Sequence, residues 1–169
     1  MKLIFVDGYN VINSWGILLE EKEISLDSAR QKLIDMLHNY GAINGCKVLI
    51  VFDGYKVAGN NRSKYEYNKN LTVVFTKDGE TADAYIEREV HGLGRKYEVY
   101  VVTSDSLEQQ TIFQRGAVRI SSIEFYNIVL EATKDVKKNI NIDNYTSKNT
   151  VQDNIEDDIF KKLEAIRRS

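Results

Sequence analysis

The sequence predicts an α/β fold in which helices cover both faces of a mainly parallel β-sheet. Short apolar runs alternate along the chain with segments whose apolar residues follow helical spacing. These runs are apolar at nearly every position, which is typical of strands that are buried on both faces. The 169 residues are enough for one domain with a single sizeable core. We therefore expect a doubly wound α/β sandwich.

The first half of the chain supplies three strands and a helix. Residues 2–6 form an apolar run that stops at Asp7-Gly8, a turn signal. Residues 27–40 place their apolar side chains at helical spacing, and Gly41 follows as a stop signal. Two further apolar runs predict strands at residues 47–52 and 71–75.

The second half repeats the alternation. Residues 81–96 predict a helix, with Thr81 as its N-cap. Residues 98–103 form another apolar run, and Ser104-Asp105 follow it. The remaining elements are a short helix, a strand and a longer helix, at residues 105–114, 117–120 and 121–136.

The pattern changes after residue 136, where we expect the domain of residues 1–136 to end. Residues 137–150 are rich in Asn and Lys and lose the helical spacing, so they predict a polar linker. Residues 151–169 regain the spacing and predict an amphipathic C-terminal helix. Such a helix packs back on the domain or docks a partner.

Composition excludes several classes of protein. Lys and Arg number 23 and Asp and Glu number 25, so the net charge of −2 argues against binding nucleic acid by bulk charge. A single Cys excludes an internal disulfide framework and a cysteine-based zinc cluster. The first apolar run is too short for a signal peptide, and no run is long enough to span a membrane. We expect a soluble cytoplasmic protein with no membrane partner.

Acidic side chains follow four of the predicted strands. Because ligand sites in an open parallel sheet lie beyond the carboxyl ends of the strands, we expect these acids to gather at one edge. Oxygen ligands of this kind suit Mg²⁺ or Mn²⁺, which can activate a water and offset charge on a phosphate. The candidate metal ligands are Asp7, Asp53, Glu80, Asp83 and Asp105.

Two polar residues stand beside these acids. Asn10 and Ser104 are possible partners for a ligand carboxylate or a phosphate. Each of these polar and acidic residues also has an ordinary structural role, in a turn or as a helix cap. Their coincidence at successive strand ends favours the functional interpretation.

A basic segment with interleaved tyrosines, predicted as a loop at residues 54–70, follows Asp53 directly. Basic groups contact phosphates, and aromatic rings stack on unpaired bases. The alternative is a solvated polar loop. We expect this loop to bind RNA through Tyr55, Lys56, Arg62, Lys64, Tyr65, Tyr67 and Lys69.

Four segments resemble the YacP-like NYN domain family, which belongs to the PIN-like ribonucleases. They are IFVDGYNVI at 4–12, VFDG at 51–54, FTKDGETADAYIE at 75–87 and VTSD at 102–105. The resemblance covers residues 1–136 in matching order, and its segment GETADAYIE is specific. It implies a PIN-like three-layer sandwich and a metal-dependent acidic centre that cleaves single-stranded RNA. It further implies cleavage of mRNA on translating ribosomes.

Carried over by position, the resemblance makes Asp7 the central metal ligand. Asp83 and Asp105 are its partners, and Glu80 ligates the metal or acts through water. Asp53 is less firmly implied, because PIN-like domains do not uniformly use an acid there. In this hypothesis a metal-activated water attacks the scissile phosphate in line and leaves a 5′-phosphate and a 3′-hydroxyl.

Two other functions are compatible with the same residues. A non-catalytic module that binds RNA or ribosomes would use the same loop, but it would have no need to concentrate acids beside phosphates. A metal-dependent phosphohydrolase could use a similar sheet. Its haloacid-dehalogenase version usually needs Asp-x-Asp after the first strand, whereas Gly8-Tyr9 follow Asp7 here.

Overall fold

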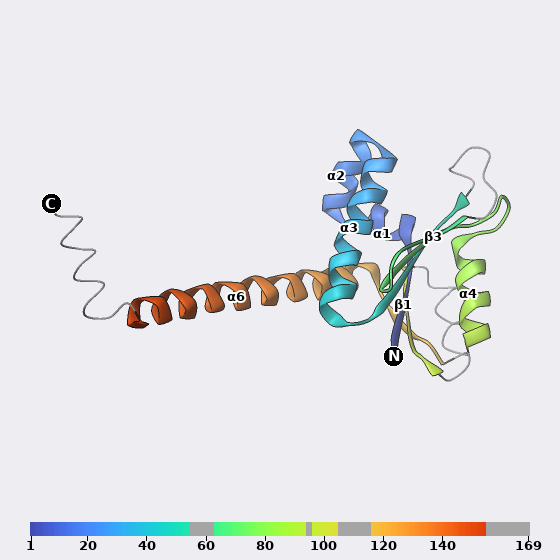
Figure 1. Cartoon of the computed structure of the whole chain (residues 1–169). Coiled ribbons are helices and arrows are strands. Elements are labelled where there is room, and N and C mark those ends of the chain that lie inside the picture. The colour runs from blue at the N-terminus through green and yellow to red at the C-terminus, as the bar shows by residue number, and fades with distance from the viewer. Residues whose placement is uncertain (55–62, 94–95, 105–115, 155–169) are drawn as a thin grey trace. The chain divides into compact units, whose positions relative to one another are not determined.

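Six strands form one sheet within the described part of the chain, in the order β3-β4-β2-β1-β5-β6 (Figure 1). This computed structural model describes residues 1–54, 63–93, 96–104 and 116–154, with side chains described as far as residue 141. All neighbouring strands are parallel except β3, which is antiparallel to β4. The strands are β1 (Lys2–Asp7), β2 (Lys47–Phe52), β3 (Ser63–Asn68), β4 (Leu71–Phe75), β5 (Glu98–Val102) and β6 (Val118–Ile120).

Helices cover both faces of this sheet. The described helices are α1 (Gly8–Ser14), α2 (Gly16–Ile24), α3 (Leu26–Asn44), α4 (Ala82–Leu93) and α6 (Ser122–Asn154). Helices α1 to α3 and the first turns of α6 pack on one face, and α4 packs on the other. The predicted α/β fold with a mainly parallel sheet is therefore confirmed.

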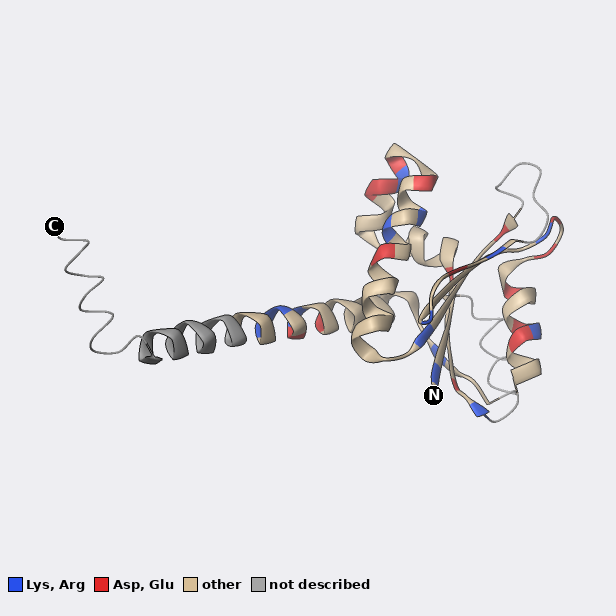
Figure 2. Cartoon of the chain, in the orientation of Figure 1, with Lys and Arg blue, Asp and Glu red and all other residues tan. Residues whose placement is uncertain are grey.

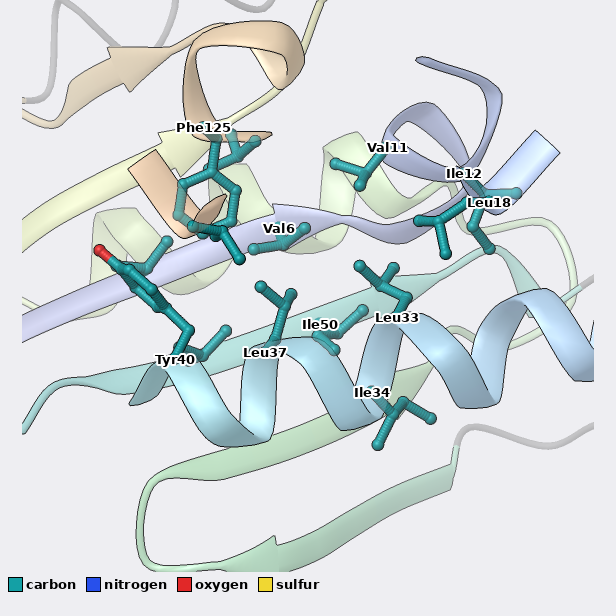
Figure 3. Close-up of a cluster of buried hydrophobic side chains, with 14 of the residues drawn as sticks. Val6, Val11, Ile12, Leu18, Leu33, Ile34, Leu37, Tyr40, Ile50 and Phe125 are labelled. Atoms are coloured by element: carbon teal, nitrogen blue, oxygen red, sulfur yellow. The ribbon is translucent and has the colours of Figure 1, made fainter. Parts of the chain in front are cut away.

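Alternation along the strands divides the apolar side chains between two cores. In β1, Ile4 and Val6 face α3, whereas Phe5 faces α4. Successive side chains of a strand point to opposite faces, so a strand apolar at every position serves both cores. Figure 3 shows the larger core, where Leu33 and Leu37 of α3 lie fully buried against the sheet.

Local signals fix both ends of α3. The hydroxyl of Ser25 accepts a hydrogen bond from the backbone N–H of Ser28 at 2.9 Å, which caps the first turn. Gly45 adopts φ 62° at the other end, a left-handed conformation that glycine takes without steric cost. These two caps set the bounds of α3 at Leu26 and Asn44.

Trp15 joins three helices on the α3 side of the sheet. It lies between α1 and α2, and its side chain is fully buried. The indole N–H donates a hydrogen bond to the carbonyl of Ser122 at 2.8 Å, which satisfies its one donor. Its ring also contacts Phe125 and Tyr126 of α6. The start of α6 is therefore fastened to the junction of α1 and α2.

Three elements were not predicted. Helices α1 and α2 occupy residues 8–24, where the sequence offers no sustained periodicity. Strand β3 occupies part of the segment that we predicted as a loop at 54–70, so that prediction is wrong for Ser63–Asn68. The predicted helix at 105–114 lies outside the described residues.

The predicted polar linker at 137–150 is helical and continues α6. This segment holds no Gly or Pro, and Asn and Lys weaken a helix without ending it. The chain divides into a compact unit, Met1–Ala132, and a second unit that begins at Thr133. Of the predicted helix at 151–169, residues 151–154 are helical and the remainder lies outside the described residues.

Charges of both signs are spread over the elements. Lys and Arg stand beside Asp and Glu along α2, α3 and α4 (Figure 2). Helix α3 carries two acids and two bases, whereas α2 and α4 each carry three acids and one base, so basic residues elsewhere in the chain bring the net charge close to zero. In the part of the chain that the structure describes, no helix combines the length and the apolar character needed to cross a bilayer.

Candidate active site

Two carboxyl groups meet at the carboxyl edge of the sheet. Asp7 is the last residue of β1, which lies between β2 and β5, and Asp83 is in the first turn of α4. Their side chains share a hydrogen bond. A hydrogen bond between two carboxyl groups requires one of them to carry a proton, so this contact favours the protonated form of Asp7.

Burial raises the pKa of Asp7 from 3.8 to about 7. The hydrogen bond with Asp83 and the negative charge of that side chain act in the same direction, and the charge of Asp53 adds to them. A backbone N–H of Asn10 opposes the rise by donating to the Asp7 carboxylate at 3.3 Å. Asp7 therefore changes its charge near neutral pH.

The position of Asp7 depends on an abrupt change from strand to helix. Asp7 caps α1 through that same bond to Asn10, and Gly8 is already helical. A Cβ on Gly8 would overlap the ring of Phe52, so only glycine fits there. Tyr9 then packs against Phe52, with ring centroids 5.0 Å apart. The Asp7-Gly8 pair is the start of a helix, where the sequence indicated only a turn.

Asp53 holds the start of α4 in place. Its carboxylate accepts a short hydrogen bond from the backbone N–H of Ala82, the first residue of α4. A carboxylate at a helix N-terminus satisfies an otherwise unpaired N–H and interacts favourably with the positive end of the helix dipole. Thr81 caps the same turn by accepting from the N–H of Ala84 at 3.1 Å. Asp53 thus helps to position Asp83, because it holds the first turn of the helix that carries Asp83.

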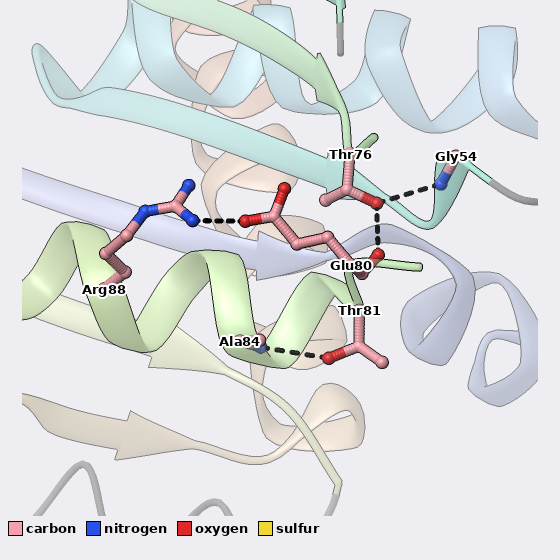
Figure 4. Close-up of polar contacts among 6 residues, drawn as sticks. All are labelled: Gly54, Thr76, Glu80, Thr81, Ala84 and Arg88. Atoms are coloured by element: carbon pink, nitrogen blue, oxygen red, sulfur yellow. Dashed lines mark hydrogen bonds and ion pairs between the residues drawn. The ribbon is translucent and has the colours of Figure 1, made fainter. Parts of the chain in front are cut away.

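Thr76 connects the end of β2 with the loop before α4 (Figure 4). Its buried hydroxyl accepts from the N–H of Gly54 at 3.0 Å and donates to the carbonyl of Glu80 at 2.6 Å. The carboxylate of Glu80, whose side chain is 6% exposed, forms an ion pair with Arg88 of α4. The structure places this predicted metal ligand against a cation of the helix that follows it.

Asn10 joins three segments that are distant in sequence. Its side-chain oxygen accepts from the N–H of Ser104 at 3.1 Å and from the hydroxyl of Ser122 at 2.7 Å. The hydroxyl of Ser104 in turn donates to that of Ser122 at 3.1 Å. Asn10 therefore fixes the backbone that leads from β5 into residue 105.

The structure brings together some of the predicted ligands. Asp7 and Asp83 meet, and Asp53 is close enough for its charge to act on Asp7. Asp105 lies outside the described residues. Among the residues that are described, no group of three or more acidic, histidine or cysteine side chains is placed to hold a metal.

The predicted RNA-binding residues are divided between the two faces of β3. Tyr65 and Tyr67 face α3, where they line a groove with Arg30 and Phe75. Lys64 and Lys69 line a separate trough of about 320 Å³ on the opposite face. The rings and the charges of this strand therefore lie on opposite faces. Tyr55, Lys56 and Arg62 lie outside the described residues.

Sequence reasoning missed several residues around these surfaces. Arg30 stands in the middle of α3 and donates a hydrogen bond to the hydroxyl of Tyr9 at 2.9 Å. Lys47 adds a third lysine to the trough of Lys64 and Lys69. No local pattern marks Arg30 or Lys47, because each depends on which strand lies beside it. The alternation of Tyr65 and Tyr67 was a usable signal of a strand.

Comparison with known proteins gives consistent matches. A model of the YacP-like NYN domain matches residues 4–168. The uncharacterized protein YacP of Bacillus subtilis (strain 168) is 36% identical to this chain over 141 residues, which are 83% of this chain and 82% of YacP.

Two crystal structures of Rae1 (YacP) from Bacillus subtilis are also similar. One has a TM-score of 0.72 at 31% identity and covers 100% of this chain and 96% of Rae1. The other, a mutant of the same protein, has a TM-score of 0.69 at 33% identity and covers 81% of this chain and 79% of Rae1.

Proposed function

The chain belongs to the YacP-like NYN domain family, and we propose that it is a metal-dependent endoribonuclease that cleaves single-stranded RNA. Family membership and the likeness to Rae1 (YacP) support a nuclease-like role related to RNA. The observation that carries the finer proposal is the meeting of Asp7 and Asp83 at the carboxyl edge of the sheet. Ligand sites of open α/β sheets lie at that edge.

The described residues fit a divalent cation. Mg²⁺ is usually held by one or two carboxylates together with substrate phosphates, and Asp7 and Asp83 supply two. A buried carboxyl group that is protonated releases its proton when a cation takes its place. When bound, Mg²⁺ or Mn²⁺ provides a water of lowered pKa and offsets negative charge on a phosphate. We propose Asp105 as a further ligand.

The other predicted residues support this pair. Asp53 and Thr76 hold the first turn of α4 and so set the position of Asp83. We assign Glu80 to the same task, because its carboxylate is paired with Arg88. Asn10 holds the backbone of Ser104, which precedes Asp105 in the sequence. These residues orient the carboxylates, which would hold the cation.

We propose mRNA on translating ribosomes as the substrate, as the family resemblance implies. Phosphate contacts fall to the lysines of the trough, Lys47, Lys64 and Lys69, which stand against the single acid Glu66 there. The basic residues of 55–62 would extend this surface. A local basic surface of this kind is compatible with a nearly neutral chain.

One experiment tests the proposal directly. The same mRNA is supplied free and under translation to the wild type and to Asp7→Asn, with Mg²⁺ and then with Mn²⁺. We expect the wild type to cleave it and Asp7→Asn to remain folded and inactive. Asp78→Asn, which removes an exposed acid on the loop before α4, is the matched control and should cleave normally.

Each alternative function has its own outcome in this assay. Unchanged cleavage by Asp7→Asn with Mn²⁺ would rule out the proposed centre. RNA or ribosome binding without cleavage under any metal would indicate a binding module. Hydrolysis of a generic phosphomonoester without RNA cleavage would indicate a phosphohydrolase. Cleavage only during translation would place the ribosome in the reaction.

A further inference from the structure

A groove of about 380 Å³ lies between α3 and the edge of the sheet. One wall is formed by Arg30 and Ile34 of α3, and the other by Tyr65 and Tyr67 of β3 with Phe75 of β4. Ile34 lies on the side of α3 that faces the β3–β4 hairpin (Figure 3). The volume is near the lower limit of ligand pockets, roughly 300 to 1,000 Å³, which suits one small planar group.

Two tyrosine rings are presented side by side on an edge strand. Tyr65 is 54% exposed and Tyr67 is 51% exposed, and both point to the α3 face because they alternate along β3. The rings of Tyr65 and Phe75 pack edge to face, with centroids 6.2 Å apart, and this contact helps to fix the orientation of the Tyr65 ring. Exposed rings that are held in place are the platforms on which unpaired bases stack.

Arg30 provides a fixed planar cation at the opposite wall. Its side chain is only 13% exposed, forms an ion pair with Asp27 and donates to the Tyr9 hydroxyl at 2.9 Å. Its guanidinium lies 5.8 Å from the centre of the Phe75 ring. A guanidinium whose position is fixed by these contacts needs little further ordering to stack on a base.

The groove lies on the α3 face of the sheet, and its residue Tyr65 is level with the carboxyl end of β1, whereas Asp7 meets Asp83 of α4, which packs on the other face. Tyr65 is in register with Val73, Val73 with Ile50, and Ile50 with Val6, the residue before Asp7. Three strand spacings separate the two positions, which is about 14 Å. Tyr9, two residues after Asp7, accepts a hydrogen bond from Arg30, which lines the groove.

We propose that this groove binds one unpaired base of the RNA, stacked on Tyr65, while another part of the same strand lies at Asp7 and Asp83. The proposal rests on the proposed ribonuclease function and names a subsite for its substrate. A base fits the observations because it is planar, small and aromatic. The RNA strand that carries the base must also reach the acidic centre. The subsite holds the strand by a ring contact that does not depend on phosphate charge.

The test compares two ligands of equal charge. A labelled oligoadenylate and a chain of the same length made only of abasic ribose phosphates are titrated into the full-length protein in EDTA, which prevents cleavage. The wild type should bind the oligoadenylate more tightly. Tyr65→Thr, which keeps strand propensity, should weaken that binding by roughly 5- to 150-fold and leave the abasic chain unaffected.

Two control variants separate the ring from its surroundings. Tyr65→Phe should retain the affinity, because the ring and not the hydroxyl stacks. Val118→Thr changes an apolar residue of similar exposure on β6, the opposite edge strand, and should have no effect. Equal loss of both ligands in Tyr65→Thr, or no loss of either, overturns the subsite.

Cleavage by the wild type after metal is restored reports on the proposed function separately. Cleavage together with an unaffected Tyr65→Thr overturns the subsite and leaves the ribonuclease proposal standing. A base-dependent loss in Tyr65→Thr without any cleavage supports the subsite and overturns the ribonuclease. Absence of both binding and cleavage overturns the two proposals together.

Discussion

The carboxylate of Asp53, at the end of β2, accepts a hydrogen bond from the backbone N–H of Ala82, which begins α4. The two residues are 29 positions apart, so a strand end supplies the cap of a distant helix. Asp83 is the next residue along that helix. The geometry of the carboxylate pair is therefore set partly from β2.

Replacing Asp53 should affect stability more than chemistry. Asp53→Ala removes the cap and should lower the free energy of unfolding by about 1 kcal/mol, whereas Asp53→Asn retains an acceptor oxygen and should lose less. Urea denaturation of both variants measures this difference. Abolished RNA cleavage in Asp53→Asn, at unchanged stability, would instead identify Asp53 as a direct metal ligand.

The raised pKa of Asp7 makes stability depend on pH. Unfolded, this carboxyl titrates near 3.8, and in the folded protein near 7. Between these values the folded state binds more protons, so the contribution of this group to stability is fully present below pH 4 and is lost as the pH rises through about 7. The interval corresponds to at most roughly 4 kcal/mol. We expect the wild type in EDTA to be less stable at pH 8 than at pH 5.

Asp7→Asn should flatten this dependence, because the amide cannot ionise. Urea denaturation at the two pH values measures the slope, and Asp78→Asn should keep the wild-type slope. Mg²⁺ at pH 8 should restore stability to the wild type and not to Asp7→Asn, because a cation stabilises the state that binds it. An identical slope in Asp7→Asn would show that another group titrates.

Gly8→Ala should destabilise the protein by about 1 to 3 kcal/mol, because the added methyl overlaps the Phe52 ring. Gly16→Ala is the matched control, because a Cβ there meets no atom within 4 Å. Combining Gly8→Ala with Phe52→Leu should recover part of the loss, measured in a double-mutant cycle. Additive losses would mean that the strain arises elsewhere.

Thr76→Val should lower the free energy of unfolding by about 1 to 3 kcal/mol. Valine keeps the shape of the side chain but removes the hydroxyl that bonds the Gly54 N–H and the Glu80 carbonyl. Thr76→Ser preserves the hydroxyl and should lose much less. Thermal denaturation of the two variants checks the order. Equal stability of Thr76→Val and the wild type would show that water replaces both bonds.

The sequence was informative wherever a role depends on position along one element. Asp7 and Asp83 could be predicted as neighbours because one ends an apolar strand and the other begins a periodic helix. In a parallel sheet, the ends of the strands and the starts of the following helices lie at the same edge. The structure brings these two together. The five apolar strands were predictable for the same reason.

Hydrogen bonds between particular side chains of distant segments could not be predicted. Asn10 meets Ser104 and Ser122, which are 94 and 112 positions away, and only the folded chain shows that its oxygen is engaged there. Strand β3 looked like a loop because its side chains are mostly exposed and polar, and it becomes a strand only by pairing with β4.

Trp15 is the one tryptophan of the chain, and it stands at the end of α1 opposite to Asp7. Its indole is shielded from water and bonded to the Ser122 carbonyl. The fold therefore contains an intrinsic fluorophore whose emission moves to longer wavelength when water reaches the ring. A shift of α1 on cation or RNA binding, and unfolding itself, can be followed optically without attaching any label.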